Sequence, residues 1–326
     1  MTEPSLRKRL SLGVDAGGTK SDAVLIDETG AVIGWGRGGS AHSLYVGTQA
    51  ALESYAEAVK SALGDHHPNE LWVAGPWYRA LDALDIGLPE VRFVQARELT
   101  MGLAMALETC GVLVLSGTGS FVGGLTESGQ TLTLDGLGPV LGDHGSGYQI
   151  GLMGIRAAMA SCWSPRRRTV LEQIIPRELG VRTLEGVFDL VYTQHIGRSR
   201  IASAARAVAR AAEDGDEIAR NIILHAADDI SEVLADVIGR LGIEDSDLAL
   251  VASGGVAQGS ALYWDRVCER ALEIAPRLRP IRPKVRPCVG AALLALKAMG
   301  IAWSHDLLAR IEETQTPFLP DVEEDS

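Results

Sequence analysis

The chain lacks several features that mark whole classes of protein. Its four cysteines form no CxxC pair or close cluster, so the sequence offers no support for a zinc or iron–sulfur site. No apolar run is long enough to span a membrane. The N-terminal stretch carries charge but no apolar signal core, because Asp15 interrupts it. A soluble, cytoplasmic protein is expected, in which Cys110 and Cys288 lie among apolar neighbours and pack in the core.

An excess of basic charge is also missing. The sequence has 30 Lys and Arg against 42 Asp and Glu, which gives a net charge of −12. Such a surface repels nucleic acid and anionic lipid, so neither is expected as a partner. The one basic run, Arg166 to Arg168, follows Pro165 and is interpreted as a solvated loop. At 326 residues the chain is too long for one ordinary core, and two domains are expected.

One pattern occurs twice in the chain. The segments "VDAGGTKSDAVLIDETG" (14–30) and "VLSGTGSFVGGLTESG" (114–129) each contain an apolar strand, a Gly/Thr/Ser loop, a second apolar strand and an acid–glycine turn. Strands are expected at 10–15, 21–26 and 31–35, and again at 112–116, 121–125 and 131–134. The middle of the chain, roughly 148–242, has helical periodicity. Two related α/β domains are therefore predicted.

The repeated loops have the composition of phosphate-binding loops. Glycine lets backbone N–H groups approach an anion closely, and Thr and Ser hydroxyls add donors. Either loop alone would be a weak signal, because glycine turns are common. The ordered set is more specific: "DAGGTK", "SGTGS" and "SGGVA" each follow a strand, "GDHGSG" opens a helix, and "PCVGAALLAL" comes last.

On these motifs, the chain resembles the N-acetylglucosamine kinase branch of the BadF/BadG/BcrA/BcrD ATPases, within the sugar kinase/actin/Hsp70 superfamily. The resemblance covers residues 12–296. It implies two ribonuclease-H-like domains with ATP in a cleft between them. The expected domains are 9–108 and 109–299, the second with a helical insertion near 160–242. A C-terminal helix near 300–312 is expected to pack back on the first domain, before a disordered tail at 315–326.

The resemblance also implies the nucleotide-binding residues. The first phosphate loop is formed by Asp15, Gly17, Gly18, Thr19 and Lys20, the second by Gly117, Thr118, Gly119 and Ser120, and the adenosine is approached by Gly254 and Gly255. Asp15, at the end of the first strand, is the candidate ligand of a hydrated Mg²⁺ that bridges the nucleotide phosphates. The alternative is that Asp15 only forms a turn. Lys20 either neutralises phosphate charge or is merely exposed.

The acceptor side departs from the family pattern. Glu98 falls on the position of the family's catalytic Asp, with Arg97 beside it on the position of an Asn. Glu98 is the candidate general base; the alternative is an ordinary Glu at a helix N-terminus. Arg97 is expected to favour the ionised carboxylate and so to weaken that base.

The sugar-binding residues that the resemblance implies are altered in part. They are His42, where the family has Asn; Thr118; Asp143, which is retained; and His144, where the family has Glu. Asp143 can serve as a helix N-cap as well as a ligand of sugar hydroxyls. Leu137 stands where relatives often have an aromatic residue. Because polar partners decide which hydroxyls a pocket accepts, these changes leave the identity of the sugar open.

The predicted function is ATP- and Mg²⁺-dependent phosphorylation of a sugar or amino sugar. One alternative is a non-catalytic relative that binds ATP and sugar as a sensor. Another is an activator ATPase of the dehydratase-activating kind, which carries an iron–sulfur cluster on paired cysteines; the scattered cysteines disfavour it. Relatives are often dimers, so a homodimer is a further expectation.

Overall fold

The computed structural model describes residues 9–76 and 90–318. The contacts between these residues divide the chain into two compact units. Unit 1 contains the described residues up to Thr109 and those from Lys284 onward, and unit 2 contains Cys110–Pro283. Each unit is built on one five-stranded sheet.

The sheet of unit 1 has the strand order β3-β2-β1-β4-β5. The first three strands are antiparallel neighbours, whereas β4 and β5 run parallel to β1. Their bounds are β1 (Arg9–Ala16), β2 (Ser21–Asp27), β3 (Val32–Gly38), β4 (Glu70–Gly75) and β5 (Val91–Gln95). The strands expected at 10–15, 21–26 and 31–35 are confirmed, the first two within one residue at each end, whereas the third extends three residues further, to Gly38.

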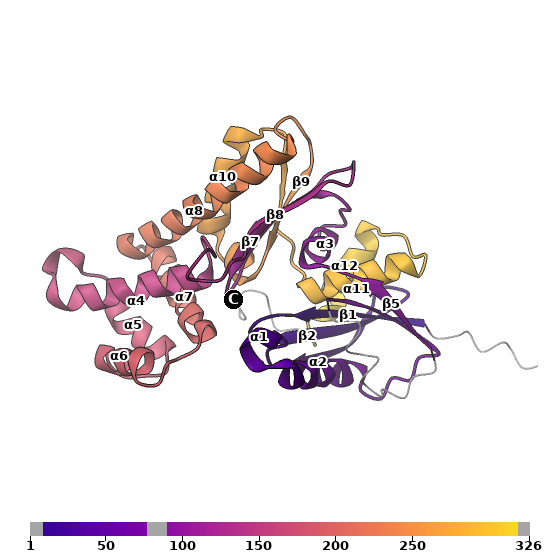
Figure 1. Cartoon of the computed structure of the whole chain (residues 1–326), viewed down its shortest axis with the longest axis horizontal. Helices are drawn as coiled ribbons and strands as arrows, with labels where there is room; N and C mark the ends of the chain where they lie inside the picture. Colours follow the sequence, from indigo (N-terminus) through magenta and orange to yellow (C-terminus); the bar gives the residue numbers. More distant parts are fainter. Residues whose placement is uncertain (1–8, 77–89, 319–326) are drawn as a thin grey trace, which may run out of the picture. The chain divides into compact units, whose positions relative to one another are not determined.

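Helices cover both faces of this sheet (Figure 1). They are α1 (Ser43–Val46), α2 (Thr48–Leu63), α3 (Glu98–Ala104), α11 (Pro287–Ala298) and α12 (His305–Gln315). On one face, α2 lies against β3 so closely that a Cβ at Gly36 would come within 2.2 Å of the Ala58 carbonyl. On the other face, a Cβ at Gly13 would come within 2.0 Å of the Cys288 carbonyl in α11. Glycine is required at both contacts because the helix backbones touch the strands.

The contacts divide the C-terminal part of the chain differently from the expected domains. Residues 284–299, expected in the second domain, belong to unit 1 because α11 packs on β1 and β4. Cys288 is fully buried in that core, as expected, and Cys110 packs at the edge of the core of unit 2. The helix expected near 300–312 is α12, which packs on β3 of the same unit. Of the tail expected to be disordered at 315–326, Gln315 is the last residue of α12, residues 316–318 form a turn, and residues 319–326 lie outside the described residues.

Unit 2 repeats the topology of unit 1. Its strand order is β10-β9-β6-β7-β8, again with three antiparallel strands followed by two parallel ones. The strands are β6 (Gly111–Ser116), β7 (Ser120–Leu125), β8 (Thr131–Asp135), β9 (Ala249–Ser253) and β10 (Arg279–Ile281). The predicted duplication is therefore confirmed in the connectivity of the two sheets.

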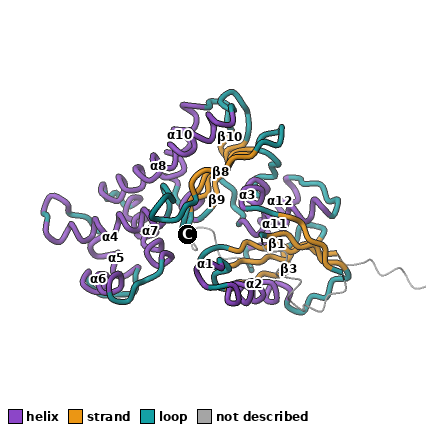
Figure 2. The backbone as a smooth tube through the Cα atoms, viewed as in Figure 1, coloured by secondary structure: helices purple, strands orange, loops and turns teal. Residues whose placement is uncertain are grey.

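The helical middle of the chain lies in unit 2, and Figure 2 shows α4 to α7 gathered to one side of its sheet. The helices are α4 (Gly147–Trp163), the short 3₁₀ helix η2 (Pro165–Arg167), α5 (Leu171–Glu178), α6 (Leu184–Tyr192), α7 (Arg198–Glu213), α8 (Glu217–Leu241), α9 (Gly255–Gly259) and α10 (Ala261–Ile274). Apolar faces of these helices form one large core with the sheet. Among the described residues, no helix is long and apolar enough to cross a membrane.

Candidate active site

In unit 1, the predicted base and the predicted metal ligand meet at one edge of the sheet. Asp15 lies near the carboxyl end of β1, and Glu98 begins α3 directly after β5. Because β1, β4 and β5 are parallel, their carboxyl ends lie at the same edge. His42, which follows β3, is close enough for its positive charge to lower the pKa of Glu98. The structure thus brings together three residues that are far apart in the sequence.

The acidic cluster of unit 1, defined as Asp15, Asp22 and Glu98, affects the proton affinity of Asp15. Desolvation and the charges of Glu98 and Asp22 raise the pKa of Asp15 from 3.8 to about 7, although Lys20 and Arg286 oppose the change. A desolvated carboxyl beside other negative charges favours a proton or a cation.

The pKa of Glu98 is raised above that of a free carboxyl. Desolvation by the surrounding protein raises the pKa of its carboxyl, and His42 opposes this. The expectation that Arg97 would lower the pKa of Glu98 is wrong, because the net shift is upward and the opposing charge comes from His42. Arg97 instead forms the N-cap of α3, where its backbone N–H donates to Thr100 Oγ1 at 3.0 Å.

Asp22 is a buried carboxylate that forms ion pairs with the basic side chains of this region. Arg37 donates to both of its carboxylate oxygens, at 2.6 and 3.0 Å. The guanidinium of Arg286, at the N-cap of α11, lies 3.9 Å away, and Lys20 Nζ lies 4.0 Å away. Lys20 is therefore held near the first loop rather than projecting freely into solvent. Asp22, Arg37 and Arg286 were not singled out from the sequence.

In unit 2, the two glycine loops lie side by side at the carboxyl edge of the sheet. Leu115 pairs with Ser253 at the ends of the parallel strands β6 and β9. A Cβ at Gly254, whose φ is +85°, would lie 2.5 Å from the Ser116 carbonyl. Gly254 must therefore be glycine for both its backbone conformation and its close approach to the loop after β6.

The loop 117–120 is held by the start of α4. The backbone N–H groups of Gly147 and Tyr148 donate to the carbonyls of Gly117 and Thr118, at 2.7 and 3.3 Å. Since these carbonyls face the helix, the loop is fixed with its acceptors turned toward protein. Ser120 Oγ donates to the His144 carbonyl at 2.6 Å, which ties the end of this loop to the next one.

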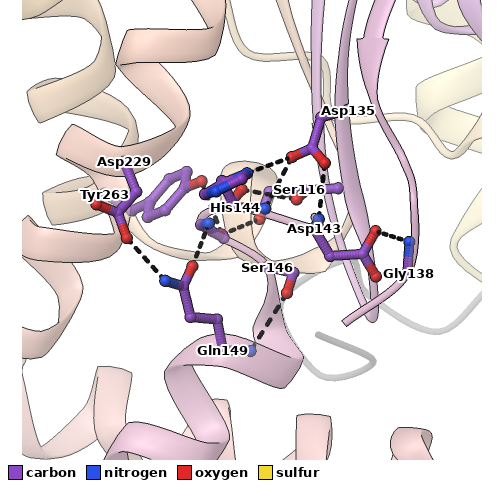
Figure 3. Close-up of polar contacts among 11 residues, drawn as sticks. Ser116, Asp135, Gly138, Asp143, His144, Ser146, Gln149, Asp229 and Tyr263 are labelled. Carbon is purple, nitrogen blue, oxygen red and sulfur yellow. Dashed lines mark hydrogen bonds and ion pairs between the residues drawn. The ribbon is translucent and has the colours of Figure 1, made fainter. Parts of the chain in front are cut away.

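The DHGS loop, residues 143–146, lies in a dense polar network (Figure 3). Ser116 Oγ and the Tyr263 hydroxyl both donate to the Gly145 carbonyl, at 2.7 and 2.9 Å. Gln149 accepts from the Gly145 N–H and donates to Asp229 at 2.7 Å. Ser146, not Asp143, is the N-cap of α4, because its hydroxyl accepts from the Gln149 N–H.

Asp135, at the end of β8, accepts hydrogen bonds from residues of this loop. Its carboxylate accepts the backbone N–H groups of Asp143 and His144, both at 2.8 Å, and the His144 ring at 3.1 Å (Figure 3). The Asp143 backbone is left-handed, with a φ of +58°. Asp135, the last residue of β8, was not singled out from the sequence.

The Asp143 carboxylate is almost fully enclosed. Its side chain is 4% exposed, and Arg198 Nη2 donates to Oδ2 at 2.8 Å. The Gly138 N–H donates to Oδ1 at 3.2 Å. Burial raises the pKa of Asp143, while Arg198 and backbone N–H groups of Ser120 and Gly138 lower it. Arg198 is a site residue that the sequence did not reveal.

The residues of unit 1 fit a magnesium ion in a limited way. Among the described residues, no group of three or more His, Cys, Asp or Glu side chains could hold a metal by itself. Mg²⁺, however, keeps several waters and commonly takes one or two carboxylates together with nucleotide phosphates. Asp15, with a raised pKa and neighbouring negative charge, suits that role.

Two sheets with the same topology, each with a loop after its first strand, define the actin-like fold of sugar kinases. A candidate N-acetylglucosamine kinase of Porphyromonas gingivalis has this fold, with a TM-score of 0.66 at 17% identity over 89% of this chain and 99% of that one. A ROK family glucokinase of Streptomyces griseus superposes with a TM-score of 0.55 at 16% identity, covering 88% and 98%.

The chain belongs to the BadF/BadG/BcrA/BcrD ATPase family, whose model matches residues 12–295. An N-acetyl-D-glucosamine kinase of Dictyostelium discoideum is 24% identical over 322 residues, or 90% of this chain and 99% of that protein. An N-acetylmuramic acid/N-acetylglucosamine kinase of Clostridium acetobutylicum is 29% identical over 185 residues. That match spans 57% of this chain and 60% of the clostridial protein.

Proposed function

We propose that the protein is an ATP-dependent kinase that phosphorylates a hydroxyl of a sugar or amino sugar. The single observation that carries this proposal is the meeting of Asp15 and Glu98 at one sheet edge, both with raised pKa values. The family and the kinases it resembles support the same reaction class.

In this mechanism Glu98 accepts the proton of the attacking sugar hydroxyl. A base with a pKa above that of a free carboxylate is better matched to that proton at neutral pH. The loop 117–120 supplies backbone and hydroxyl donors to the phosphates, as does the first loop, 17–20. Gly254 and Gly255 leave room for the adenosine, and His42, Thr118, Asp143 and His144 contact the sugar. These ligand contacts, and the sharing of one nucleotide by the two units, are predictions.

The proposed reaction uses Mg²⁺, and Asp15 is its proposed ligand. When bound, Mg²⁺ neutralises charge on the nucleotide phosphates and helps to place them for transfer. Asp15 would hold the hydrated ion, and Lys20 would add positive charge to the same loop. Binding of a cation here would also relieve the repulsion within the acidic cluster. A cytoplasmic location and a homodimer, both expected from the sequence, remain predictions that accompany this function.

The acceptor is proposed to be N-acetylglucosamine or a close amino sugar, because the two curated relatives carry that substrate in their names. N-acetylmuramic acid is the second acceptor to test, since the clostridial relative is named for both sugars. The deciding assay is ADP release from Mg²⁺-ATP with hexoses, free amino sugars and both N-acetylated sugars. ATP binding without sugar-stimulated turnover would instead support a non-catalytic sensor.

Replacing Glu98 by glutamine tests the base directly. Loss of a general base commonly costs about 10²- to 10⁴-fold in rate, so turnover should fall by at least about 100-fold. The dissociation constant for ATP should stay within about twofold, because a change of tenfold would need about 1.4 kcal/mol of lost contacts. Turnover close to that of the wild type would rule out Glu98 as the base.

A further inference from the structure

One ion pair of unit 2 stands beside the proposed sugar residues without a role in the mechanism above. Arg198 is the first residue of α7, and its guanidinium donates to Asp143 Oδ2 at 2.8 Å. The Asp143 side chain is 4% exposed and that of Arg198 is 23% exposed. The carboxylate of Asp143 is therefore shielded from solvent, whereas the guanidinium of Arg198 is partly exposed to solvent.

The position of Arg198 in its helix is unfavourable for the helix itself. The N-terminal end of an α-helix carries partial positive charge, so a cation in the first turn is repelled. No acidic residue stands in the first turn of α7 to offset this. The contact with Asp143 therefore compensates an arrangement that helix stability alone would not select.

Gly119 provides the space in which the pair lies. A Cβ at Gly119 would come within 2.7 Å of Arg198 Nη2 and 2.8 Å of Asp143 Oδ2. At Gly117, in the same loop, a Cβ would meet its nearest neighbours only at 3.8 Å, which is an ordinary contact. The two glycines therefore differ. A side chain at Gly119 would collide with the ion pair, whereas a side chain at Gly117 would not.

Asp143 is held at several points, whereas Arg198 reaches it from α7. The backbone of Asp143 is left-handed, and its N–H is held by Asp135 at 2.8 Å. Its Oδ1 also accepts from Gly138 N–H. Arg198 reaches the carboxylate by the end of a long side chain. A ligand hydroxyl that approaches Oδ2 would therefore meet an acceptor oriented by the backbone and paired with the guanidinium of Arg198.

We propose that Arg198 is a positioning residue for the acceptor sugar, which keeps the Asp143 carboxylate ionised and oriented in the space left open by Gly119. This inference rests on the proposed function, because it assumes that Asp143 accepts hydrogen bonds from sugar hydroxyls. It also assigns Gly119 to the sugar-binding site, whereas the sequence assigned it to the phosphate loop of the nucleotide site. A neutral Asp143 would be a poorer acceptor, so the affinity for the sugar depends on its counter-ion.

The test compares Arg198→Gln with Arg198→Lys, Asp143→Asn and the double variant. Arg198→Gln should weaken sugar binding by about tenfold or more, measured as KM and by calorimetry without nucleotide, and leave the KM for ATP within about twofold. Arg198→Lys keeps the charge and should recover part of the affinity. The double variant should bind sugar no more weakly than Asp143→Asn alone, because the two residues act as a unit.

A pH profile separates this role from a purely structural one. The groups that face the Asp143 carboxylate are Arg198 from α7, Asp135 from the end of β8, and the N–H groups of Ser120 and Gly138. Without Arg198, burial and Asp135 both raise the pKa of Asp143, so sugar affinity of Arg198→Gln should improve as pH rises from 6 to 9. The wild type should change little over that range.

Two further variants guard against misfolding as an explanation. Arg206→Gln, on the same helix, removes an arginine paired with Glu178 at 2.9 Å and should leave sugar affinity unchanged. Gly119→Ala changes no charge but should separate the pair, and so should weaken sugar binding as Arg198→Gln does.

Equal losses of sugar and ATP affinity in Arg198→Gln, or no loss of sugar affinity, would overturn the proposal. So would a wild type that binds no sugar. Sugar binding that depends on Arg198 in a protein without turnover would instead support this inference and refute the kinase.

Discussion

Replacing Asp15 by asparagine is expected to stabilise the protein at alkaline pH, although it removes the proposed metal ligand. The folded protein raises the pKa of this carboxyl from 3.8 to about 7. Native Asp15 therefore binds its proton more tightly than the unfolded chain does. Its favourable contribution is complete below pH 3.8 and is lost as pH rises through about 7, above which the folded state must hold an unfavourable charge.

The size of the effect follows from the same pKa. Each pKa unit corresponds to about 1.4 kcal/mol, so the ionised carboxylate costs the folded state at most about 4 kcal/mol above pH 7. Because Asp15 is only half-buried, solvent screening reduces this to roughly 2 kcal/mol. In a domain of this size, each kcal/mol shifts Tm by about 2–4 °C. Asp15→Asn should therefore raise Tm by roughly 4–8 °C at pH 8.

The assay is thermal unfolding by circular dichroism at pH 8 and pH 4, without divalent metal. The gain should be present at pH 8 and nearly absent at pH 4, where the native carboxyl is already protonated. Asp245→Asn, at an exposed turn, is the control and should behave like the wild type at both pH values. A lower Tm for Asp15→Asn at pH 8, or an equal change at both pH values, would refute the reasoning. Mg²⁺ should stabilise the wild type and not the variant.

Two other predictions concern stability. Gly254→Ala should lower the free energy of unfolding in urea by more than Gly129→Ala, whose φ is also positive at +82°, because only the first places a methyl 2.5 Å from the Ser116 carbonyl. Equal losses would show that backbone strain alone matters. Asp216→Ala should cost about 1–2 kcal/mol at pH 7, because Asp216 caps α8 through the Ala219 N–H. Burial raises the pKa of Asp216, but hydrogen bonds to its carboxylate outweigh burial and lower the pKa. The stability lost in Asp216→Ala should therefore become smaller below pH 3.8. A loss of stability that does not change with pH would contradict this.

The sequence predicted the repeated sheets because their patterns are local. A strand, a glycine loop and a second strand lie within about twenty residues, so the hairpins of β1–β2 and β6–β7 can be read without knowing the rest of the fold. The same local pattern placed Asp15 at a strand end. Glu98 was found only through the resemblance, since a Glu at a helix start has an ordinary structural explanation.

The parts that were missed depend on contacts between distant residues. Arg198 and Asp143 are separated by 55 positions, and the helical segment that carries Arg198 shows only an amphipathic period. The helical pattern of α11 likewise does not say which sheet it covers. Its place in unit 1 is decided by Gly13, where the strand backbone leaves room for the helix, and that requirement is visible only in three dimensions.

The duplicated topology also explains how one fold supplies two kinds of chemistry. In both units the loop after the first strand lies at the carboxyl edge of the parallel strands. In unit 1 that edge carries Asp15 and Glu98, whose pKa values are raised mainly by desolvation. In unit 2 the same edge carries Gly117 and Gly254, and its main carboxylate, Asp143, already has a cation in Arg198. A divalent cation is therefore expected to bind at unit 1 rather than at Asp143 of unit 2, and isothermal titration with Mg²⁺ of Asp15→Asn and Asp143→Asn would check this.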